Sequence, residues 1–392
     1  MKKVFIAEAV RTPIGSFGGV LSSLSAVDLG AMVIRAVLER QAVSPDRIDE
    51  IFMGNVCQAN LGQAPARQAA LKAGLPPKVP CTTVNKVCSS GLKSVMFGAQ
   101  SIMLSQADMI IAGGMESMSN IPYYVTKARW GYKYGGGELV DGLERDGLMD
   151  AYDHQAMGVF ADRTATHYQI SREEQDEYAI QSYRRSASST NEGKFNSEII
   201  PVSIPQRKGE ALLVGEDEEY KKVFFDKIPS LRPAFSLDGT VTAANASTIN
   251  DGASALLLAS ENAIKEYGLQ PLAEIIGFSD AAREPQWFTT APVLAAPRAI
   301  ERAGLKINDI DIFEVNEAFA VVPLAFGREL NVSTDRMNIH GGAVSLGHPL
   351  GASGARILTT LVHALHTQGK ETGCATLCNG GGGASALVVK KV

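Results

Sequence analysis

Two segments far apart in the chain resemble each other, residues 45–55 and residues 307–316. Each reads as a helix end, a short acidic turn and a buried strand that finishes in Asn. Cys88 follows the first of these Asn residues by 33 positions, and His348 follows the second by 32. The agreement in spacing favours duplication over chance. A duplicated unit of this kind predicts two similar α/β domains, each with a mostly parallel sheet covered by helices.

The length of the chain, 392 residues, predicts two or three domain-sized units. Apolar residues recur with helical spacing after Cys88, and the apolar run at 109–112 predicts a short buried strand bounded by two glycines. Residues 120–246 are rich in Gly, Tyr and charge and contain one clear helix near 171–190, which indicates an insertion. The expected units are an N-terminal domain of residues 1–119 completed by about 247–270, an inserted loop domain of residues 120–246 and a C-terminal domain of residues 271–392.

Composition excludes several classes of protein. Hydrophobic residues make up 45% and charged residues 20% of the chain, as in a soluble globular protein, and the net charge of −5 provides no nucleic-acid footprint. No apolar run is long enough to span a bilayer, and the Met1-Lys2-Lys3 start leads directly into a strand-like segment with no room for a targeting peptide. We therefore expect a cytoplasmic protein. The five cysteines include no CxxC pair, so neither a disulfide framework nor a zinc site is predicted.

Cys88 stands at the start of the predicted amphipathic helix. The N–H groups and dipole of a helix N-terminus lower the pKa of a thiol and favour the nucleophilic thiolate. The alternative is a small buried hydrophobe, which is the commonest role of a free cysteine. Taken alone, the motif favours that alternative.

His348 lies in a Gly-rich segment, residues 340–354, that precedes a helix. Glycines let the backbone approach a ligand, and Pro349 restricts the backbone of His348, which helps to fix the direction of the imidazole. A fixed imidazole near a thiol is what general-base activation requires. The alternative is a histidine that caps its own loop.

Two further segments carry groups that could take part in chemistry. Cys378 precedes a run of four glycines, 380–383, whose N–H groups could form an oxyanion hole. Asn316 ends the second predicted strand and can hold a water or a carbonyl. The alternatives are a Gly-rich turn without a ligand and a plain turn residue.

Together these segments resemble the thiolase family, from Arg11 to the C-terminus. The most specific motifs are Gly-His-Pro-x-Gly-x-Ser-Gly at 347–354 and Cys-x-Gly-Gly-Gly at 378–382. The resemblance implies a thiolase-like α/β fold, with two duplicated α/β domains, central mixed sheets in a layered arrangement and an inserted loop domain. A finer likeness to biosynthetic-type and mitochondrial-type acetoacetyl-CoA thiolases is carried by residues 85–91, 113–119 and 242–247.

The resemblance implies a two-thiol mechanism for the reversible condensation of two acetyl-CoA to acetoacetyl-CoA. Cys88, activated by His348, is acylated, and Cys378 removes an α-proton from a second acetyl-CoA. One oxyanion hole would use His348 and a water on Asn316. The other would use the backbone N–H groups of Cys88 and Gly380.

Coenzyme A thioesters are the substrates that this resemblance implies. Along the pantetheine channel it places Leu148, Phe235, Ser247, Ala318 and Phe319. Lys222 and Lys227 would lie near the nucleotide end, although a pair such as Lys221-Lys222 is equally well explained as solvated charge.

The mitochondrial-type subgroup binds a potassium ion through backbone carbonyls and one Tyr hydroxyl. Its pattern maps here onto Tyr183, Ala243, Ala244, Ala246 and Val344, so a potassium ion is expected although the chemistry requires no cofactor. The resemblance also implies a homotetramer, a dimer of dimers with the loop near 123–140 as the tetramer contact.

Departures from the family pattern keep other functions open. Ala156 stands where close relatives often have a histidine that contacts pantetheine, so a degradative 3-ketoacyl-CoA thiolase of broader chain length is the nearest alternative. His154 could substitute for that histidine, but we expect it at the surface; His340 replaces a usual Asn. Phe288 resembles the subgroup that accepts 2-methyl-branched substrate. A β-ketoacyl synthase is disfavoured by Cys378, and a non-enzymatic scaffold by the full set of four reactive side chains.

Overall fold

The computed structural model describes residues 2–206 and 208–392. Ten strands form one mixed sheet in the order β12-β13-β14-β11-β1-β10-β5-β3-β4, with β2 paired to β10. The pairs β12–β13, β3–β4 and β3–β5 are parallel and the other pairs in this sheet are antiparallel. The strands are β1 (Val4–Arg11), β2 (Gly15–Ser16), β3 (Glu50–Gly54), β4 (Cys81–Val84), β5 (Met109–Ser117), β6 (Tyr123–Tyr124), β7 (Val140–Asp141), β8 (Val202–Ile204), β9 (Leu212–Val214), β10 (Asn250–Ser260), β11 (Ala273–Ala282), β12 (Ile312–Val315), β13 (Thr372–Asn379) and β14 (Gly383–Lys391).

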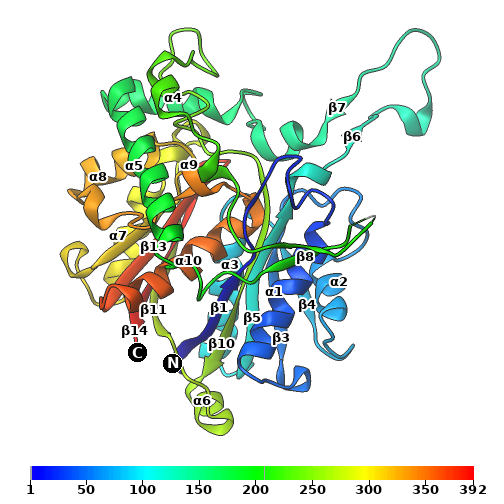
Figure 1. Cartoon of the computed structure of the whole chain (residues 1–392), viewed down its shortest axis with the longest axis vertical. Helices are drawn as coiled ribbons and strands as arrows, with labels where there is room; N and C mark the ends of the chain where they lie inside the picture. Colours follow the sequence, from blue (N-terminus) through cyan, green and yellow to red (C-terminus); the bar gives the residue numbers. More distant parts are fainter. Residues whose placement is uncertain (1, 207) are drawn as a thin grey trace.

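The helices form three layers about this sheet (Figure 1). Helices α1 and α2 pack on the outer face of the N-terminal strands, and α7 and α8 pack on the outer face of the C-terminal strands. Helices α3 and α10 lie between the two sets of strands and share one core with both. The helices are α1 (Ala26–Arg40), α2 (Pro65–Lys72), α3 (Ser90–Met103), α4 (Met157–His167), α5 (Arg172–Asn191), α6 (Glu261–Tyr267), α7 (Pro292–Arg302), α8 (Val321–Leu330), α9 (Ala343–Leu346) and α10 (Leu350–Thr367).

The central position of α10 follows from its sequence. Every residue from Leu350 to Leu365 is buried, so the helix has no solvent face in its first four turns. Apolar residues predominate, although the helix also buries Arg356 and His363, and a helix without a solvent face has to be enclosed by other elements. Here it is enclosed by strands of both halves and by α3.

The two halves repeat one hydrogen-bond pattern, as the resemblance between residues 45–55 and 307–316 predicts. The carboxylate of Asp49 accepts from the backbone N–H groups of Asp108 and Met109, at 2.7 and 2.9 Å. The carboxylate of Asp311 accepts from the corresponding groups of Glu371 and Thr372, both at 3.0 Å. Two features differ from the prediction: the strands of the two halves form one sheet, because β1 and β11 join them through two residue pairs, and the expectation of mostly parallel strands was wrong, because most of the pairs are antiparallel.

Strand β5 is longer than predicted. The apolar run was expected to end at Gly113 and Gly114, but the strand continues through both to Ser117 and is buried throughout. A Cβ atom on Gly114 would lie 2.0 Å from the carbonyl oxygen of Gly351 at the start of α10. The glycines therefore mark a close backbone approach and not a strand end.

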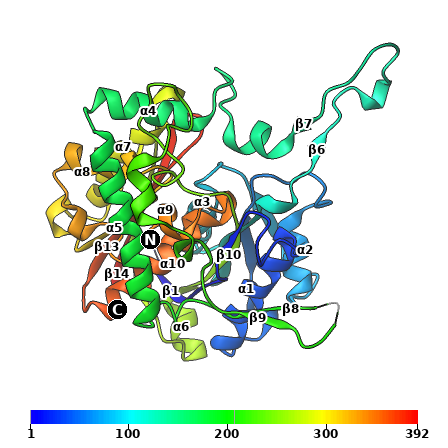
Figure 2. The same ribbon diagram turned by 45° about the horizontal axis from the view of Figure 1, so that its top comes forward.

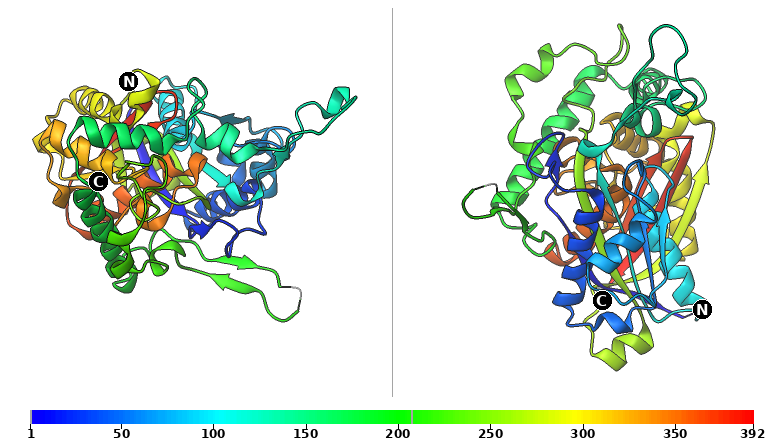
Figure 3. Two further views of the ribbon diagram at one scale, coloured as in Figure 1. Left: turned by 90° about the horizontal axis from the view of Figure 1, so that it is seen from above. Right: turned by 90° about the vertical axis from the view of Figure 1, so that its right-hand side faces the viewer.

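The segment 120–246 contains the predicted helix, which is α5, and a second helix, α4, that was not predicted. Its π-helical turn, Glu144–Leu148, leads toward the central core. The β6–β7 arm extends from the body, and the β8–β9 hairpin extends in another direction (Figures 1, 2 and 3). Within the described residues, no helix is long and apolar enough to cross a membrane.

Candidate functional site

The crossing of α3 and α10 brings the starts of these two helices together. A Cβ atom on Gly91 would lie 2.8 Å from the amide nitrogen of Ala355, and one on Gly354 would lie 2.4 Å from that of Leu92. Backbone atoms cannot move aside as a side chain can, so only glycine permits this distance. Because Cys88 precedes α3 and His348 precedes α10, the crossing sets both residues at the same place.

Cys88 is buried, with 8% of its surface exposed, directly before α3. Burial raises the pKa of its thiol to about 11, while hydrogen bonds from the backbone N–H groups of Gly380 and of Cys88 itself act in the opposite direction. Backbone N–H groups therefore lower the pKa of the Cys88 thiol as predicted, but burial raises this pKa by more. The thiol is neutral at pH 7 and needs a proton acceptor to become a nucleophile.

The hydrogen bonds of His348 assign its tautomer. Its Nδ1 lies 2.6 Å from Oγ of Ser353, and that hydroxyl donates its hydrogen to the carbonyl oxygen of Pro349 at 2.8 Å. The hydroxyl can then only accept from Nδ1–H, so Nε2 carries the lone pair. Nε2 is buried and has no hydrogen-bond partner in the described part of the chain.

The environment keeps this imidazole neutral. Burial, assisted by the guanidinium charge of Arg356, lowers the pKa of His348 to about 3. The backbone N–H of His348 donates to Oδ1 of Asn250 at 2.9 Å, which fixes the loop. A neutral, oriented imidazole with a free lone pair is suited to accept a thiol proton.

Asn316 follows β12, where its backbone N–H donates to the carbonyl oxygen of Thr376 at 3.0 Å. Its side-chain Nδ2 lies 3.5 Å from Nδ1 of His348. Its Oδ1 is a buried acceptor without a partner among the described protein groups. The amide therefore lies beside the imidazole, where it can bind a polar group of a ligand.

Cys378 lies near the end of β13 and is fully buried. Burial, and then the neighbouring sulfur of Cys88, raise the pKa of its thiol above the usual range. The loops that carry the two thiols are joined, because Oγ of Ser89 donates to Oδ1 of Asn379 at 3.0 Å. The structure thus brings both sulfur atoms into one site.

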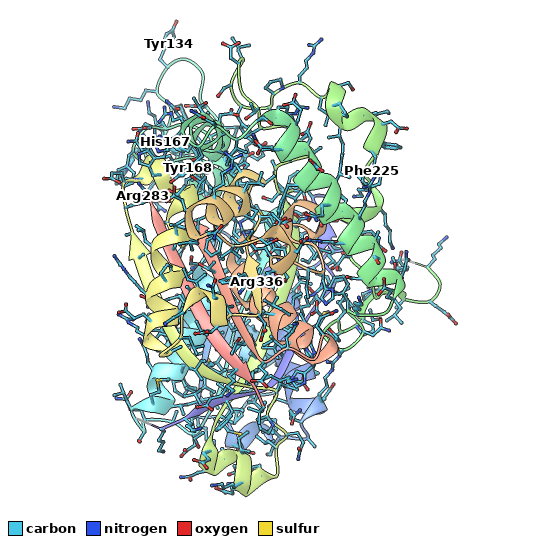
Figure 4. The ribbon with its side chains drawn as sticks, turned by 90° about the vertical axis from the view of Figure 1, so that its left-hand side faces the viewer. Tyr134, His167, Tyr168, Phe225, Arg283 and Arg336 are labelled. Atoms are coloured by element: carbon cyan, nitrogen blue, oxygen red, sulfur yellow. The ribbon has the colours of Figure 1, made fainter. Side chains whose placement is uncertain are left out.

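Gly380 lies in the turn between β13 and β14, and its N–H points at the sulfur of Cys88. The turn is fixed from outside by the backbone N–H of Arg283, which donates to the carbonyl oxygen of Gly382 at 2.9 Å. Arg283 lies with His167 and Tyr168 on the flank of the molecule (Figure 4). Two N–H groups directed at one sulfur form the geometry of an anion-stabilising site.

A buried carboxylate behind the site was not singled out from the sequence. Glu116 accepts hydrogen bonds from the backbone N–H groups of Val56, Cys57 and Gly351, and from the amide of Asn55, at 2.7–3.2 Å. Burial raises its pKa to about 7 in spite of these donors. Glu116 therefore links the end of β3 to the start of α10. The other positioning residues that sequence reasoning missed are Ser89, Asn250, Ser353 and Asn379.

Most of the expected channel residues also lie together. The rings of Phe235 and Phe319 meet edge to face at 6.0 Å, and the backbone N–H of Ser247 donates to the carbonyl oxygen of Ala318 at 3.0 Å. Leu148 packs separately against the central core that contains Cys88. These residues form apolar surface in and beside the site, as pantetheine requires.

The two expected lysines are exposed at the surface. Lys222 forms an ion pair with Glu218 at 2.9 Å and donates to the hydroxyl of Ser16. The ammonium of Lys227 lies 4.6 Å from the ring centroid of Phe224. Both are surface groups, and the geometry alone fits the solvated-charge alternative as well as a contact with the nucleotide.

The residues expected to hold potassium are partly assembled. Tyr183 and Val344 pack together in a small buried cluster. The carbonyl oxygens of Ala243, Ala244 and Ala246 and the hydroxyl of Tyr183 form no hydrogen bond within residues 2–206 and 208–392. Burial, and then the carboxylates of Glu219 and Glu317, raise the pKa of Tyr183 above the usual range. Unpaired oxygens near two acidic groups are a suitable environment for a monovalent cation.

The residues that depart from the family pattern have distinct environments. His154 is exposed, as expected. His340 is buried, with Nδ1 at 2.9 Å from Oγ of Ser189, and burial lowers its pKa. Phe288 is buried edge to face against Phe160.

Comparisons with known proteins find similarity along nearly the whole chain. The family model for the thiolase N-terminal domain matches residues 4–262, and that for the thiolase C-terminal domain matches residues 269–391. A probable acetyl-CoA acetyltransferase of Dictyostelium discoideum is 53% identical, covering 100% of this chain and 95% of its own length. The cytosolic acetyl-CoA acetyltransferase ERG10 of Gibberella zeae is 50% identical, covering 99% and 98%. The crystal structure of Acat5 thiolase from Ascaris suum in complex with coenzyme A superimposes with a TM-score of 0.95 at 48% identity and covers 100% of both chains.

Proposed function

The chain belongs to the thiolase family of acyltransferases, and we propose that it is an acetyl-CoA C-acetyltransferase. In this reaction two acetyl-CoA condense to acetoacetyl-CoA and free CoA, and thiolysis is the reverse. Relatives at 50–53% identity over nearly the whole chain are named acetyl-CoA acetyltransferases, which supports this substrate. The observation that carries the mechanism is a pair of neighbouring buried thiols beside the α3–α10 crossing, at which α10 begins just after one neutral imidazole whose Nε2 lone pair is free.

The first half-reaction acetylates Cys88. Nε2 of His348 takes the thiol proton, and the thiolate attacks the thioester carbonyl of acetyl-CoA. The N–H groups of Cys88 and Gly380 stabilise the oxyanion that forms. The C–S bond to CoA breaks, and the CoA thiolate leaves with the proton from His348. Burial of the site disfavours separated charges, so proton transfer is concerted with attack.

The second half-reaction forms the carbon–carbon bond. The thiol of Cys378 first gives its proton to Nε2 of His348. The resulting thiolate takes an α-proton from a second acetyl-CoA, and the imidazolium of His348 with a water held by Asn316 stabilises the enolate oxygen. The enolate carbon attacks the acetyl carbonyl on Cys88, the C–S bond to Cys88 breaks, and acetoacetyl-CoA is released. The imidazolium of His348 then gives its proton to the Cys88 thiolate, which leaves both cysteines as thiols and His348 neutral.

The test compares two buried cysteines. Cys88→Ser should abolish acetoacetyl-CoA cleavage and retain the fold. Cys374→Ser changes a fully buried thiol in the same strand as Cys378, outside the proposed chemistry, and should retain cleavage. If the unmutated protein cleaves no 3-ketoacyl-CoA, the scaffold alternative is correct.

The second candidate function is a 3-ketoacyl-CoA thiolase of broader chain length, as Ala156 suggests. The backbone of Ala156 forms a β-bridge with Met149, which holds this segment in place although the side chain of Ala156 is small. Steady-state kinetics in both directions with C4, 2-methyl-C4 and longer 3-ketoacyl-CoA substrates distinguish the two. A kcat/KM that falls steeply beyond C4 supports the first candidate, and a flat profile supports the second.

We further propose the coenzyme A contacts, assembly and location that the family implies. Leu148, Phe235, Ser247, Ala318 and Phe319 would contact pantetheine, with Lys222 and Lys227 toward the nucleotide. The β6–β7 arm would join two dimers into a tetramer, because it exposes Trp130 and Tyr134, and exposed aromatic groups of this kind mark association surfaces. A cytoplasmic location agrees with the cytosolic relative from Gibberella zeae. The domain limits near residues 119, 246 and 270 are proposed on the same basis.

A further inference from the structure

Lys86, two residues before Cys88, joins the nucleophile loop to the C-terminal strands. Its ammonium donates to Oδ1 of Asp280 on β11 at 2.5 Å, to Oγ of Ser385 on β14 at 2.8 Å and to the carbonyl oxygen of Ala384 at 3.0 Å. An ammonium has three donors, and each has an acceptor here. The contact is partly buried, with 26% of the lysine side chain exposed.

The backbone between Lys86 and Cys88 is strained. Val87 has φ of +48°, in the left-handed region that β-branched residues rarely adopt. The turn is stabilised locally because Oγ of Ser90 accepts from the backbone N–H of Lys86 at 2.8 Å and donates to the carbonyl oxygen of Val87 at 2.6 Å. Strain of this kind persists only where the surroundings hold the backbone in place.

Ala384, which accepts a hydrogen bond from Lys86, lies opposite the second thiol, Cys378. Ala384 is the cross-strand partner of Cys378 in the β13–β14 pair, and the turn of this pair carries Gly380. A shift of Lys86 relative to Ala384 therefore changes the distance between the sulfur of Cys88 and the N–H of Gly380. Lys86 is not among the groups whose charge perturbs the pKa of Cys88.

From this arrangement we propose that Lys86 is a positioning residue that holds the strained Val87–Cys88 turn at the correct distance from the Gly380 N–H and Cys378. This inference rests on the proposed function, in which Cys88 is acylated and Gly380 stabilises its oxyanion. The role is geometric, because Lys86 touches neither sulfur in the hydrogen bonds of the described residues.

Lys93 provides a matched control, because it binds the same carboxylate as Lys86, that of Asp280. Its ammonium donates to Oδ2 of Asp280 at 2.6 Å, so it shares the acid with Lys86, but it lies on α3 and stacks on the ring of Phe97 at 4.6 Å. Its ammonium forms no hydrogen bond to Ser385 or Ala384 within the described chain. Loss of Lys93 removes a comparable ion pair and leaves the strained turn attached to β14.

The experiment compares Lys86→Met with Lys93→Met in the full-length protein. Three assays are used: steady-state thiolysis of acetoacetyl-CoA, which gives kcat and KM; alkylation of Cys88 by iodoacetamide as a function of pH, followed on the Cys88 peptide; and urea unfolding, which gives the midpoint. Displacements of about 1 Å at a reacting centre cost on the order of 100-fold in rate, so we expect at least about a tenfold loss of kcat in Lys86→Met with little change in KM. The alkylation profile should move to higher pH, because a weaker Gly380 hydrogen bond favours the thiolate less.

Lys93→Met should lower the urea midpoint by a similar amount but retain kcat and the alkylation profile. Ser385→Ala removes one acceptor of Lys86 and should change kcat and the alkylation profile in the same direction as Lys86→Met. If Lys86→Met does not fold, Ser385→Ala tests the positioning role in its place. Equal kcat values and alkylation profiles in the two lysine variants would overturn the inference. An unmutated protein without thiolase activity would refute the proposed function, while the alkylation profiles would still test the role of Lys86.

Discussion

Gly91→Ala tests whether the α3–α10 crossing sets the catalytic geometry. The new Cβ atom would lie 2.8 Å from the amide nitrogen of Ala355 and 2.9 Å from the carbonyl oxygen of Gly351, both backbone atoms of α10. Contacts of this type need roughly 3.4 Å or more, so the helices must separate by about half an ångström. Overpacking of a close-packed interior costs about 1–3 kcal/mol. Because Cys88 and His348 precede the two helices, we also expect a loss of kcat of about tenfold or more.

The control is Gly98→Ala in the same helix. Its nearest neighbours would be Cδ1 of Leu258 at 2.8 Å and Cγ2 of Ile110 at 3.0 Å, which are side-chain and not backbone atoms, and the Leu258 methyl group can rotate away. Alanine is favoured over glycine in a helix interior by about 1 kcal/mol, which offsets part of the crowding. Urea unfolding and steady-state thiolysis would be measured for both variants. Equal losses of stability and of kcat in the two variants would refute the reasoning.

Three further outcomes are expected. Thiolysis rates and acetoacetyl-CoA affinity should be higher in potassium than in sodium buffer, and Tyr183→Phe should reduce the difference; identical values in both buffers would exclude potassium activation. His348 has a pKa of about 3 in the folded protein and of about 6.5 in an unfolded chain, so between these pH values only the unfolded chain binds the proton. The free energy of unfolding therefore falls by up to about 1.4 kcal/mol per pH unit as pH drops from about 6.5 toward 3. His348→Asn removes this term and should unfold at lower pH than the unmutated protein; an unchanged acid midpoint would contradict it. Replacement of residues 123–140 by a short Gly/Ser linker should convert tetramers to dimers in light scattering with the fold retained, and an unchanged mass would show that the arm is not the contact.

The elements that the sequence predicted correctly are those with local signals. The helix after Cys88 follows from apolar spacing, and in the structure the helix near 171–190 begins at a capping box formed by Ser171 and Glu174. Helix α4 carried a comparable signal in the spacing of Phe160, Ala161 and Ala165, but its loop-rich surroundings obscured it. The end of β5 was predicted wrongly because glycine marks both turns and close backbone approaches, and a single sequence does not distinguish them.

The amino-acid sequence by itself determined the thiolase family and the α/β plan, and it predicts which side chains react, because local motifs and their spacing carry this information. The tertiary structure decided the protonation state of those side chains. A helix N-terminus predicts a lowered thiol pKa, yet burial from both halves raises the pKa of Cys88 to about 11 and lowers that of His348 to about 3. Desolvation depends on everything packed around a group, so it is absent from any local pattern. The positioning contacts of Lys86, Glu116 and Ser353 likewise join residues that only the folded chain brings together.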